Sequence, residues 1–205
     1  MKTEILDSKD PGALRRARQV LRSGGLVAFP TDTVYGLGCE VLNAEAVSRL
    51  YHVKGRPEEK AIPVLASGTK ALSQVAKPFP EIARRLAKRF WPGPLTLVVW
   101  RLPELPPELS RYETVAVRVP DHELALALLK KVGPLAVTSA NRAGKADSVT
   151  AIDVLATLGG TFDLLLDGGE APGGMPSTVV DCTQAEPYVL RAGPTSADDI
   201  IAALK

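Results

Sequence analysis

Short runs of aliphatic residues alternate along this chain with segments of helical periodicity, and this alternation limits most strongly what it can fold into. Leu26–Phe29 and Leu135–Thr138 are continuously apolar, as strands are when helices cover both faces of a sheet. Between such runs, apolar side chains recur every three or four positions, as at Ile82, Leu86 and Phe90. Strands that alternate with helices predict an α/β fold with a mixed, largely buried sheet.

Capping residues and chain breakers set the expected boundaries of these elements. Asp10-Pro11 is expected to start the first helix and Asn43 the second, and Thr150 with Asp153 has the spacing of a capping box. Because proline cannot donate to a β-ladder, Pro63 predicts that strand Ile62–Leu65 lies at an edge or begins there. Further strands are expected at Leu95–Trp100, Thr114–Val119, Phe162–Leu166, Thr178–Asp181 and Tyr188–Leu190, and further helices at Leu124–Val132 and after Ser196.

Composition excludes several classes of protein. The chain has 205 residues, of which 45% are hydrophobic and 23% charged, and this suits one large globular domain or two small ones. Its apolar runs fall short of the roughly 20 residues that cross a bilayer, and the first residues lack the apolar core of a signal peptide. We therefore expect a cytoplasmic protein with no membrane association. Cys39 and Cys182 alone make neither a disulfide framework nor a zinc motif, and we expect both to be buried.

The net charge is only +2, so no overall field draws the chain to nucleic acid or membrane. Any anion that it binds must meet a local group of cations. Lys54 and Arg56 form one candidate, although cations at the end of a helix also complement its dipole. The Gly-Arg-Pro break after Lys54 favours phosphate binding, because it fixes a planar guanidinium in a loop.

Polar groups follow the apolar strands at several points. Thr31, Asp32 and Thr33 come directly after a buried strand, and Gly36 and Gly38 then permit a close backbone approach. These groups either hold a small polar ligand or cap a turn, and local chemistry favours neither. Ser139 and Asn141 follow another strand and leave the same choice. A further hydroxyl, that of Ser177, precedes a strand, and Arg191 ends the next one.

Arg118 lies inside the apolar strand Thr114–Val119. An unpaired buried guanidinium is costly, so it must reach solvent or find an anionic partner. A structural ion pair would meet this need, and so would the carboxylate of a ligand, which is the more specific hypothesis.

The chain lacks the common motifs of nucleotide binding and hydrolysis: it has no GxxxxGK[ST], GxGxxG, GxSxG or HExxH. His52 and His122 are its only histidines, too few for a metal or proton-transfer cluster. Hydroxyls and cations without an evident nucleophile and base suit catalysis by positioning and charge neutralisation.

Seven segments in order resemble the YrdC-like family, the threonylcarbamoyl-AMP synthases that begin synthesis of N6-threonylcarbamoyladenosine in tRNA. They are PTDTVYGLG at 30–38, KGRP at 54–57, WPGPLT at 91–96, VAVRVP at 115–120, SAN at 139–141, PSTVVD at 176–181 and LRAG at 190–193. The match runs from about residue 24 to 194. The resemblance implies one domain over residues 1–205, a twisted mixed sheet flanked by helices around a deep basic cavity. Longer relatives add a second domain, so this chain is similar to the short form.

The resemblance also implies an activity and roles for individual residues. L-threonine, bicarbonate and ATP would condense to threonylcarbamoyl-AMP and pyrophosphate, with Mg²⁺ entering with ATP and no metal motif in the chain. The product would pass to a threonylcarbamoyl transferase complex that modifies adenosine 37 of tRNA. The implied catalytic set is Lys54, Arg56, Ser139 and Asn141. The implied ATP-binding set is Arg56, Lys60, Thr114, Ser139, Asn141, Ser148 and Arg191. The implied threonine-binding set is Thr33, Arg118 and Ser177.

A second hypothesis rests on helix 82–90, where like charges stand four residues apart. This spacing suits the phosphates of double-stranded RNA or tRNA, and it predicts a maturation factor without synthase turnover. A solvated helix face explains the same charges. A relative of the same fold with altered substrates, such as carbamoyl phosphate, is the third possibility. The residues concerned are Arg84, Arg85, Lys88 and Arg89.

Overall fold

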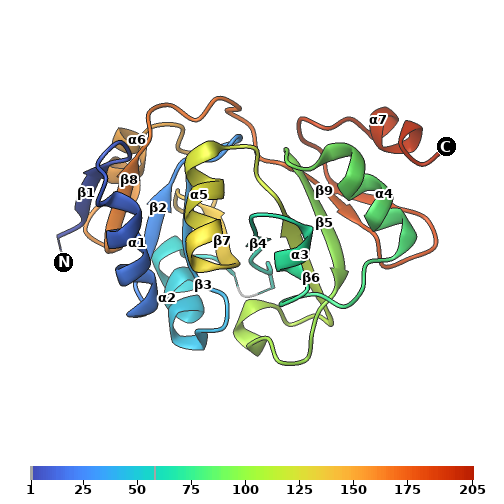
Figure 1. Ribbon diagram of the computed structural model, residues 1–205, viewed down its shortest axis with the longest axis horizontal. Helices are drawn as coiled ribbons and strands as arrows, with labels where there is room; N and C mark the ends of the chain where they lie inside the picture. The colour runs from blue at the N-terminus through green and yellow to red at the C-terminus, as the bar shows by residue number, and fades with distance from the viewer. Residues whose placement is uncertain (1, 58) are drawn as a thin grey trace.

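The computed structural model describes residues 2–57 and 59–205, and within them ten strands form a single mixed sheet (Figure 1). The strand order is β1-β8-β2-β3-β7-β4-β6-β5-β9-β10. The pairs β1–β8, β2–β8, β4–β6 and β5–β9 are parallel, and the other neighbours are antiparallel. The expected single-domain α/β fold is confirmed. No helix that the structure describes is long and apolar enough to span a bilayer.

The elements have the following bounds. The strands are β1 (Glu4–Asp7), β2 (Val27–Phe29), β3 (Gly36–Glu40), β4 (Val64–Leu65), β5 (Leu95–Trp100), β6 (Thr114–Arg118), β7 (Leu135–Ser139), β8 (Leu164–Asp167), β9 (Thr178–Asp181) and β10 (Tyr188–Arg191). The helices are α1 (Ala13–Arg22), α2 (Ala44–Lys54), α3 (Thr69–Leu72), α4 (Glu81–Phe90), α5 (Glu123–Val132), α6 (Ala151–Leu158) and α7 (Ala197–Ala202), with a 3₁₀ turn at Pro107–Leu109.

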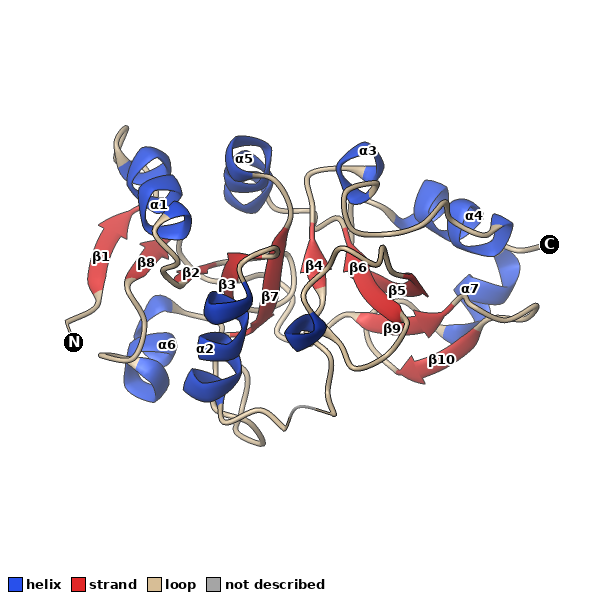
Figure 2. Ribbon diagram, turned by 90° about the horizontal axis from the view of Figure 1, so that it is seen from below, coloured by secondary structure: helices blue, strands red, loops and turns tan. Residues whose placement is uncertain are grey.

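Helices cover both faces of the central strands, which explains why those strands are continuously apolar (Figure 2). Val27 and Phe29 of β2 pack in the core formed with α1 and α5. Ala28, between them, points to the opposite core, which α2 and α6 complete. Because successive strand residues point to opposite faces, both sets of side chains must be apolar here.

Several helix caps follow the sequence closely. The Oδ1 atom of Asn43 accepts a hydrogen bond from the backbone N–H of Ala46 at 3.0 Å. Thr150 and Asp153 form the expected capping box, each side chain accepting from the other's backbone N–H. Ser196 caps the last helix, as expected.

One boundary prediction is wrong, and a second holds in part. The first helix begins at Ala13, because Asp10 instead accepts from the N–H of Gly12 in a preceding turn. Strand β4 lies between β7 and β6 and is not an edge strand, but it begins at Val64, directly after Pro63, in line with the other alternative. Pro63 comes just before it and takes part through its carbonyl, which accepts from the N–H of Val137. The N–H that this proline lacks therefore removes no hydrogen bond from the sheet.

Strand β3 is a feature that sequence patterns did not predict. Gly36 and Gly38 permit a close approach, as expected, but the approach is to the neighbouring strand β7. A Cβ atom on Gly36 would lie 2.7 Å from Cγ1 of Val137, closer than packed atoms tolerate. The two glycines thus allow the segment that follows Thr31–Thr33 to pack closely against β7, in the middle of the sheet.

We predict that Gly36→Ala lowers the free energy of unfolding by about 1–3 kcal/mol, because the new methyl group overpacks a core that cannot expand freely. Urea unfolding measures this change. Gly68→Ala is the matched control, since no atom lies within 4 Å of its added Cβ. Equal stability of the two variants would contradict the close packing of β3 on β7.

Candidate active site

A small cavity lies across the middle of the sheet, and three arginines line it: Arg56, Arg118 and Arg191. We call it the arginine cavity. Its volume is about 100 Å³, and the deep basic cavity that the resemblance implies is not seen. Hydroxyl groups complete the polar lining, from Thr31, Thr96, Thr138, Ser139 and Ser177.

The cavity crosses the sheet and does not sit at one edge of it. Leu65 of β4 pairs with Leu135 on one side and with Arg118 on the other. Arg118 is therefore level with the first residue of β7, whereas Ser139 is the last residue of that strand. Because β6 runs antiparallel to β7, Arg118 and Ser139, each the last residue of its strand, approach the cavity from opposite directions.

Arg118 is buried, and every nitrogen of its guanidinium has a protein partner. Nε donates to the carbonyl of Gly93 at 3.0 Å, and Nη1 donates to Oγ1 of Thr33 at 3.1 Å. Nη2 forms an ion pair with Oδ1 of Asp32, and the two side chains are only 6% and 10% exposed. The structural ion pair is therefore present. The other oxygen of Asp32, Oδ2, is buried without a hydrogen-bond partner among the described residues.

Lys54 lies behind the cavity wall and holds the segment that follows β7. Its ammonium donates to the carbonyl oxygen of Ser139 at 2.7 Å and to that of Asn141 at 2.9 Å. The side-chain oxygens of the same two residues also accept from it. Burial, with the nearby charge of Arg56, lowers the pKa of Lys54 from 10.5 to about 8. Lys54 therefore acts here as a positioning residue for Ser139, and Asn141 belongs to the same support.

Backbone carbonyls hold the other two arginines of the cavity. Arg56 donates through Nε to the carbonyl of Lys60 at 2.7 Å and through Nη2 to that of Ala61 at 2.9 Å. Arg191 donates through Nε and Nη2 to the carbonyl of Ser177. Partial burial lowers the pKa of Arg191, and the charges of Arg118 and Arg56 act in the same direction. Carbonyls orient these cations without cancelling their charge, which leaves a site suited to anions.

Six expected site residues do not line the cavity. Lys54, Asn141 and Thr33 support residues that do, and the other three are Lys60, Ser148 and Thr114. Lys60 contributes its carbonyl, as a support for Arg56. Ser148 is buried and donates to the carbonyl of Ala140. Thr114 begins β6, four residues before Arg118. Their implied contacts with ATP stay predictions.

The cavity also contains a polar residue that sequence patterns did not single out. Thr96 is buried in β5, and its hydroxyl lies 2.8 Å from that of Ser177. The available signal was a lone polar residue within the apolar run Leu95–Trp100, the same signal that drew attention to Arg118.

Both cysteines are free and buried, as expected, and burial raises the pKa of each thiol to about 12. They are therefore unreactive core residues. Within residues 2–57 and 59–205, no group of three His, Cys, Asp or Glu side chains could hold a metal ion.

Comparison with known proteins places this geometry in a family. The Sua5/YciO/YrdC family model, described as "Telomere recombination", matches residues 19–193. The chain belongs to this family. The threonylcarbamoyl-AMP synthase of Pyrococcus abyssi is 42% identical over 189 residues, which cover 91% of this chain and 56% of that protein. The enzyme of the same name from Bacillus subtilis is 41% identical over 205 residues, which cover 98% of this chain and 59% of that protein.

A solved structure of P. abyssi Sua5 complexed with L-threonine superposes on this fold with a TM-score of 0.90. The two are 41% identical, and the match covers 93% of this chain and 57% of that one. This chain thus spans less than two thirds of the length of these relatives.

We predict that Asp32→Ala lowers the free energy of unfolding by roughly 3–5 kcal/mol, because it leaves the buried Arg118 without a counter-charge. Glu4→Ala, which breaks the exposed pair with Arg16, should leave the urea midpoint almost unchanged. Similar small losses in both variants would show that Arg118 does not depend on Asp32.

A pH-dependent stability is expected from Lys54. Between about pH 8 and 10.5 the unfolded chain keeps the lysine proton while the folded chain has released it. The unfolded state then binds more protons, so this group makes stability rise with pH, by up to about 1.4 kcal/mol per pH unit. Urea unfolding of wild type and Lys54→Met at pH 7.5, 8.5 and 9.5 should show the wild type gaining on the variant. Lys131→Met, at an exposed position, provides the baseline, and a difference independent of pH would contradict the prediction.

Proposed function

We propose that this chain is a threonylcarbamoyl-AMP synthase, which condenses L-threonine, bicarbonate and ATP to threonylcarbamoyl-AMP and pyrophosphate. The observation that carries the proposal is the convergence of Arg56, Arg118 and Arg191, from distant parts of the chain, on one cavity. The names of the relatives and the threonine complex of P. abyssi Sua5 support it. They favour a synthase over an RNA-binding maturation factor without turnover.

The threonine end of the site would lie at Arg118. Its guanidinium faces the cavity although Asp32 already pairs with it, so a substrate carboxylate would share this cation. Thr33 is bonded to Arg118, and Ser177 stands in the same cavity. The hydroxyl of Ser177 lies between Thr96 and Arg191, at 2.8 and 3.2 Å, and can bind a polar group of the amino acid.

The nucleotide end would be formed by Arg56, Ser139 and Arg191. Nη1 of Arg56 has no hydrogen-bond partner among the described residues, so it can donate to a phosphate oxygen. Lys54 and Asn141 would act by holding Ser139 in place. We retain Lys60, Thr114 and Ser148 as proposed contacts of ATP.

The chemistry requires no covalent attachment to the protein. The threonine nitrogen would form a bond to the carbon of bicarbonate-derived CO₂ and lose a proton, which gives a carbamate. A carbamate oxygen would then attack the α-phosphorus of ATP while the bond to the pyrophosphate oxygen breaks. Arg56 and Arg191 would neutralise charge on the phosphates. Mg²⁺ would supply further neutralisation when held by phosphate oxygens and water, an arrangement that needs no cluster of protein ligands.

The partners follow from this reaction. The product would pass to a transferase complex that acts on adenosine 37 of tRNA, and a direct contact with tRNA belongs to the same proposal. Since ATP is a reactant and the product is used to modify tRNA, we place the reaction in the cytoplasm.

We predict that Arg56→Ala reduces threonine-dependent pyrophosphate release by at least about 100-fold, because it removes a charge-assisted donor from the phosphates. The assay contains ATP, Mg²⁺, bicarbonate and threonine, with a reaction lacking threonine as blank. Arg22→Ala, an exposed arginine on α1, should retain wild-type turnover. Full turnover in Arg56→Ala would overturn the assignment of this cavity as the active site.

A further inference from the structure

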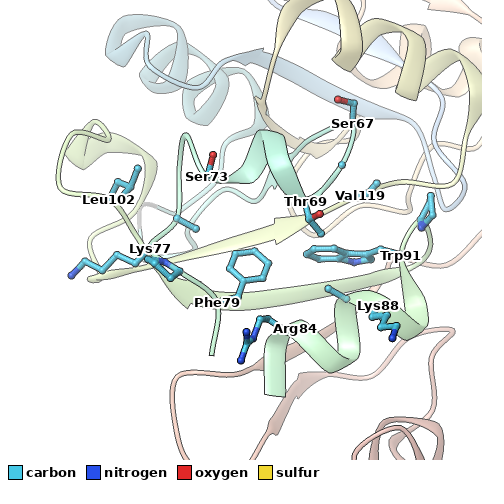
Figure 3. Close-up of a pocket in the computed structure, with 15 residues that line it drawn as sticks. Ser67, Thr69, Ser73, Lys77, Phe79, Arg84, Lys88, Trp91, Leu102 and Val119 are labelled. Atoms are coloured by element: carbon cyan, nitrogen blue, oxygen red, sulfur yellow. The ribbon is translucent and has the colours of Figure 1, made fainter. Parts of the chain in front are cut away.

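A hollow larger than the arginine cavity lies outside it, between α3, α4 and the end of β6 (Figure 3). Its volume is about 920 Å³. Figure 3 shows the rings of Phe79 and Trp91 together at its centre, with Lys77, Arg84 and Lys88 around them. We call this hollow the α4 groove. It stands near the upper end of the roughly 300–1,000 Å³ that ligand sites occupy.

The two rings give the groove flat apolar surfaces. Their centroids are 6.1 Å apart, with an angle of 69° between the planes, so the edge of one ring meets the face of the other. Both side chains are only half-buried. The indole N–H of Trp91 already donates to the carbonyl of Leu95, which fixes the ring in its place. Surfaces of this kind are stacking platforms for planar groups.

The charged residues that line the groove around these rings are all basic. Lys77, Arg84 and Lys88 line the groove and are exposed, and none of the described residues that line it is acidic. Glu81 pairs with Arg84, but both side chains are 66% exposed, so solvent screens this pair and a phosphate can replace the carboxylate. The groove therefore combines phosphate-binding cations with aromatic faces.

We propose that the α4 groove binds a single-stranded segment of RNA, with a base stacked on Phe79 or Trp91 and phosphates on the three cations. A duplex would hide its base faces in its own stack and leave the rings unused. An acidic peptide would satisfy the cations, but Asp and Glu carry no aromatic ring to stack on Phe79 or Trp91. The function lies beyond the proposed synthase reaction and does not depend on it.

The groove is also linked to the active site through the chain. Val119 and Pro92 line the groove, whereas their neighbours Arg118 and Gly93 belong to the arginine cavity and its support. The two hollows thus share one wall.

Trp91 provides a direct signal of binding. The chain has two tryptophans, and Trp100 does not line the groove, so a Trp100→Phe background leaves Trp91 as the sole reporter. We expect decauridylate to quench its emission saturably. If three cations contact a single strand, the logarithm of the association constant should decrease with the logarithm of the salt concentration, with a slope of about −2.

Two charge-reversal variants, both in the Trp100→Phe background, distinguish binding in the groove from general attraction of RNA to basic surface residues. Arg84→Glu/Lys88→Glu should weaken binding at least about tenfold, because two phosphate contacts are lost. Arg15→Glu/Arg22→Glu changes the net charge equally, on α1, beside a hollow whose described lining contains no aromatic residue. It should bind decauridylate as tightly as the background protein. Equal losses in the two variants would overturn the proposal.

Stacking is tested by Phe79→Leu, which keeps an apolar side chain and should weaken binding about tenfold while the urea midpoint stays near that of the background. Unchanged affinity in this variant would contradict stacking on Phe79. Equally tight binding of a ten-base-pair RNA duplex would indicate phosphate recognition alone, and equally tight binding of deca-glutamate would indicate a protein partner. Either result overturns the proposal.

The synthase assay tests the proposed synthase activity separately from RNA binding in the α4 groove. Arg84→Glu/Lys88→Glu should retain wild-type pyrophosphate release, since neither residue lines the arginine cavity. Loss of decauridylate binding with full turnover supports the α4 groove. Failure of the wild type to turn over ATP would remove the proposed function and leave the binding result unaffected.

Discussion

A guanidinium buried in the middle of a ten-stranded sheet is the constraint on which this structure depends. Arg118 cannot reach solvent, so the fold must supply partners for all its nitrogens. It does so from two loops: the segment after β2 gives Asp32 and Thr33, and the segment before β5 gives the carbonyl of Gly93. The requirements of one side chain thereby bring two distant motifs over the face of β6. The resulting cavity is a consequence of satisfying that charge.

The remaining cations near the site are held in a different way. Lys54, Arg56 and Arg191 are all bound by backbone carbonyls, and the oxygens that hold them come from the segments that line or support the cavity. A carbonyl dipole fixes a cation's direction without removing its charge. The site therefore keeps a positive potential for a polyanion, while Arg118 alone is paired with a carboxylate. This difference in partners divides the cavity into a strongly cationic part and a nearly neutral part.

Local signals predicted much of the fold and less of the site. The cap at Asn43, the capping box at Thr150 and the strand Thr178–Asp181 follow from short-range chemistry, and all are present. Strand β3 was missed because its glycines signal a close backbone approach without saying to what. Pro63 marks the start of β4, but it could not show that the strand is internal, because a proline just before a strand removes no donor from the ladder. These outcomes depend on contacts between distant segments, which local patterns do not contain.

In the site, too, local patterns predicted single residues but not their contacts with distant segments. Arg118 was recognised as a charge in need of a partner, yet nothing in its own strand identifies Asp32, which is 86 residues away. Motifs named Lys54 and Ser139 together, but only their hydrogen bonds show that the lysine supports the serine. Thr96 was missed because a single hydroxyl in an apolar strand is weak evidence until its partner, Ser177, is seen.

The wall shared by the two hollows has a mechanical consequence. Pro92 and Gly93 are consecutive, and one faces the α4 groove while the carbonyl of the other orients Arg118. A ligand that displaced Trp91 or Pro92 would drag that carbonyl with them, and the guanidinium on the far side would turn or lose a bond. The carbonyl that orients the amino-acid end of the cavity thus belongs to the same segment that borders the groove.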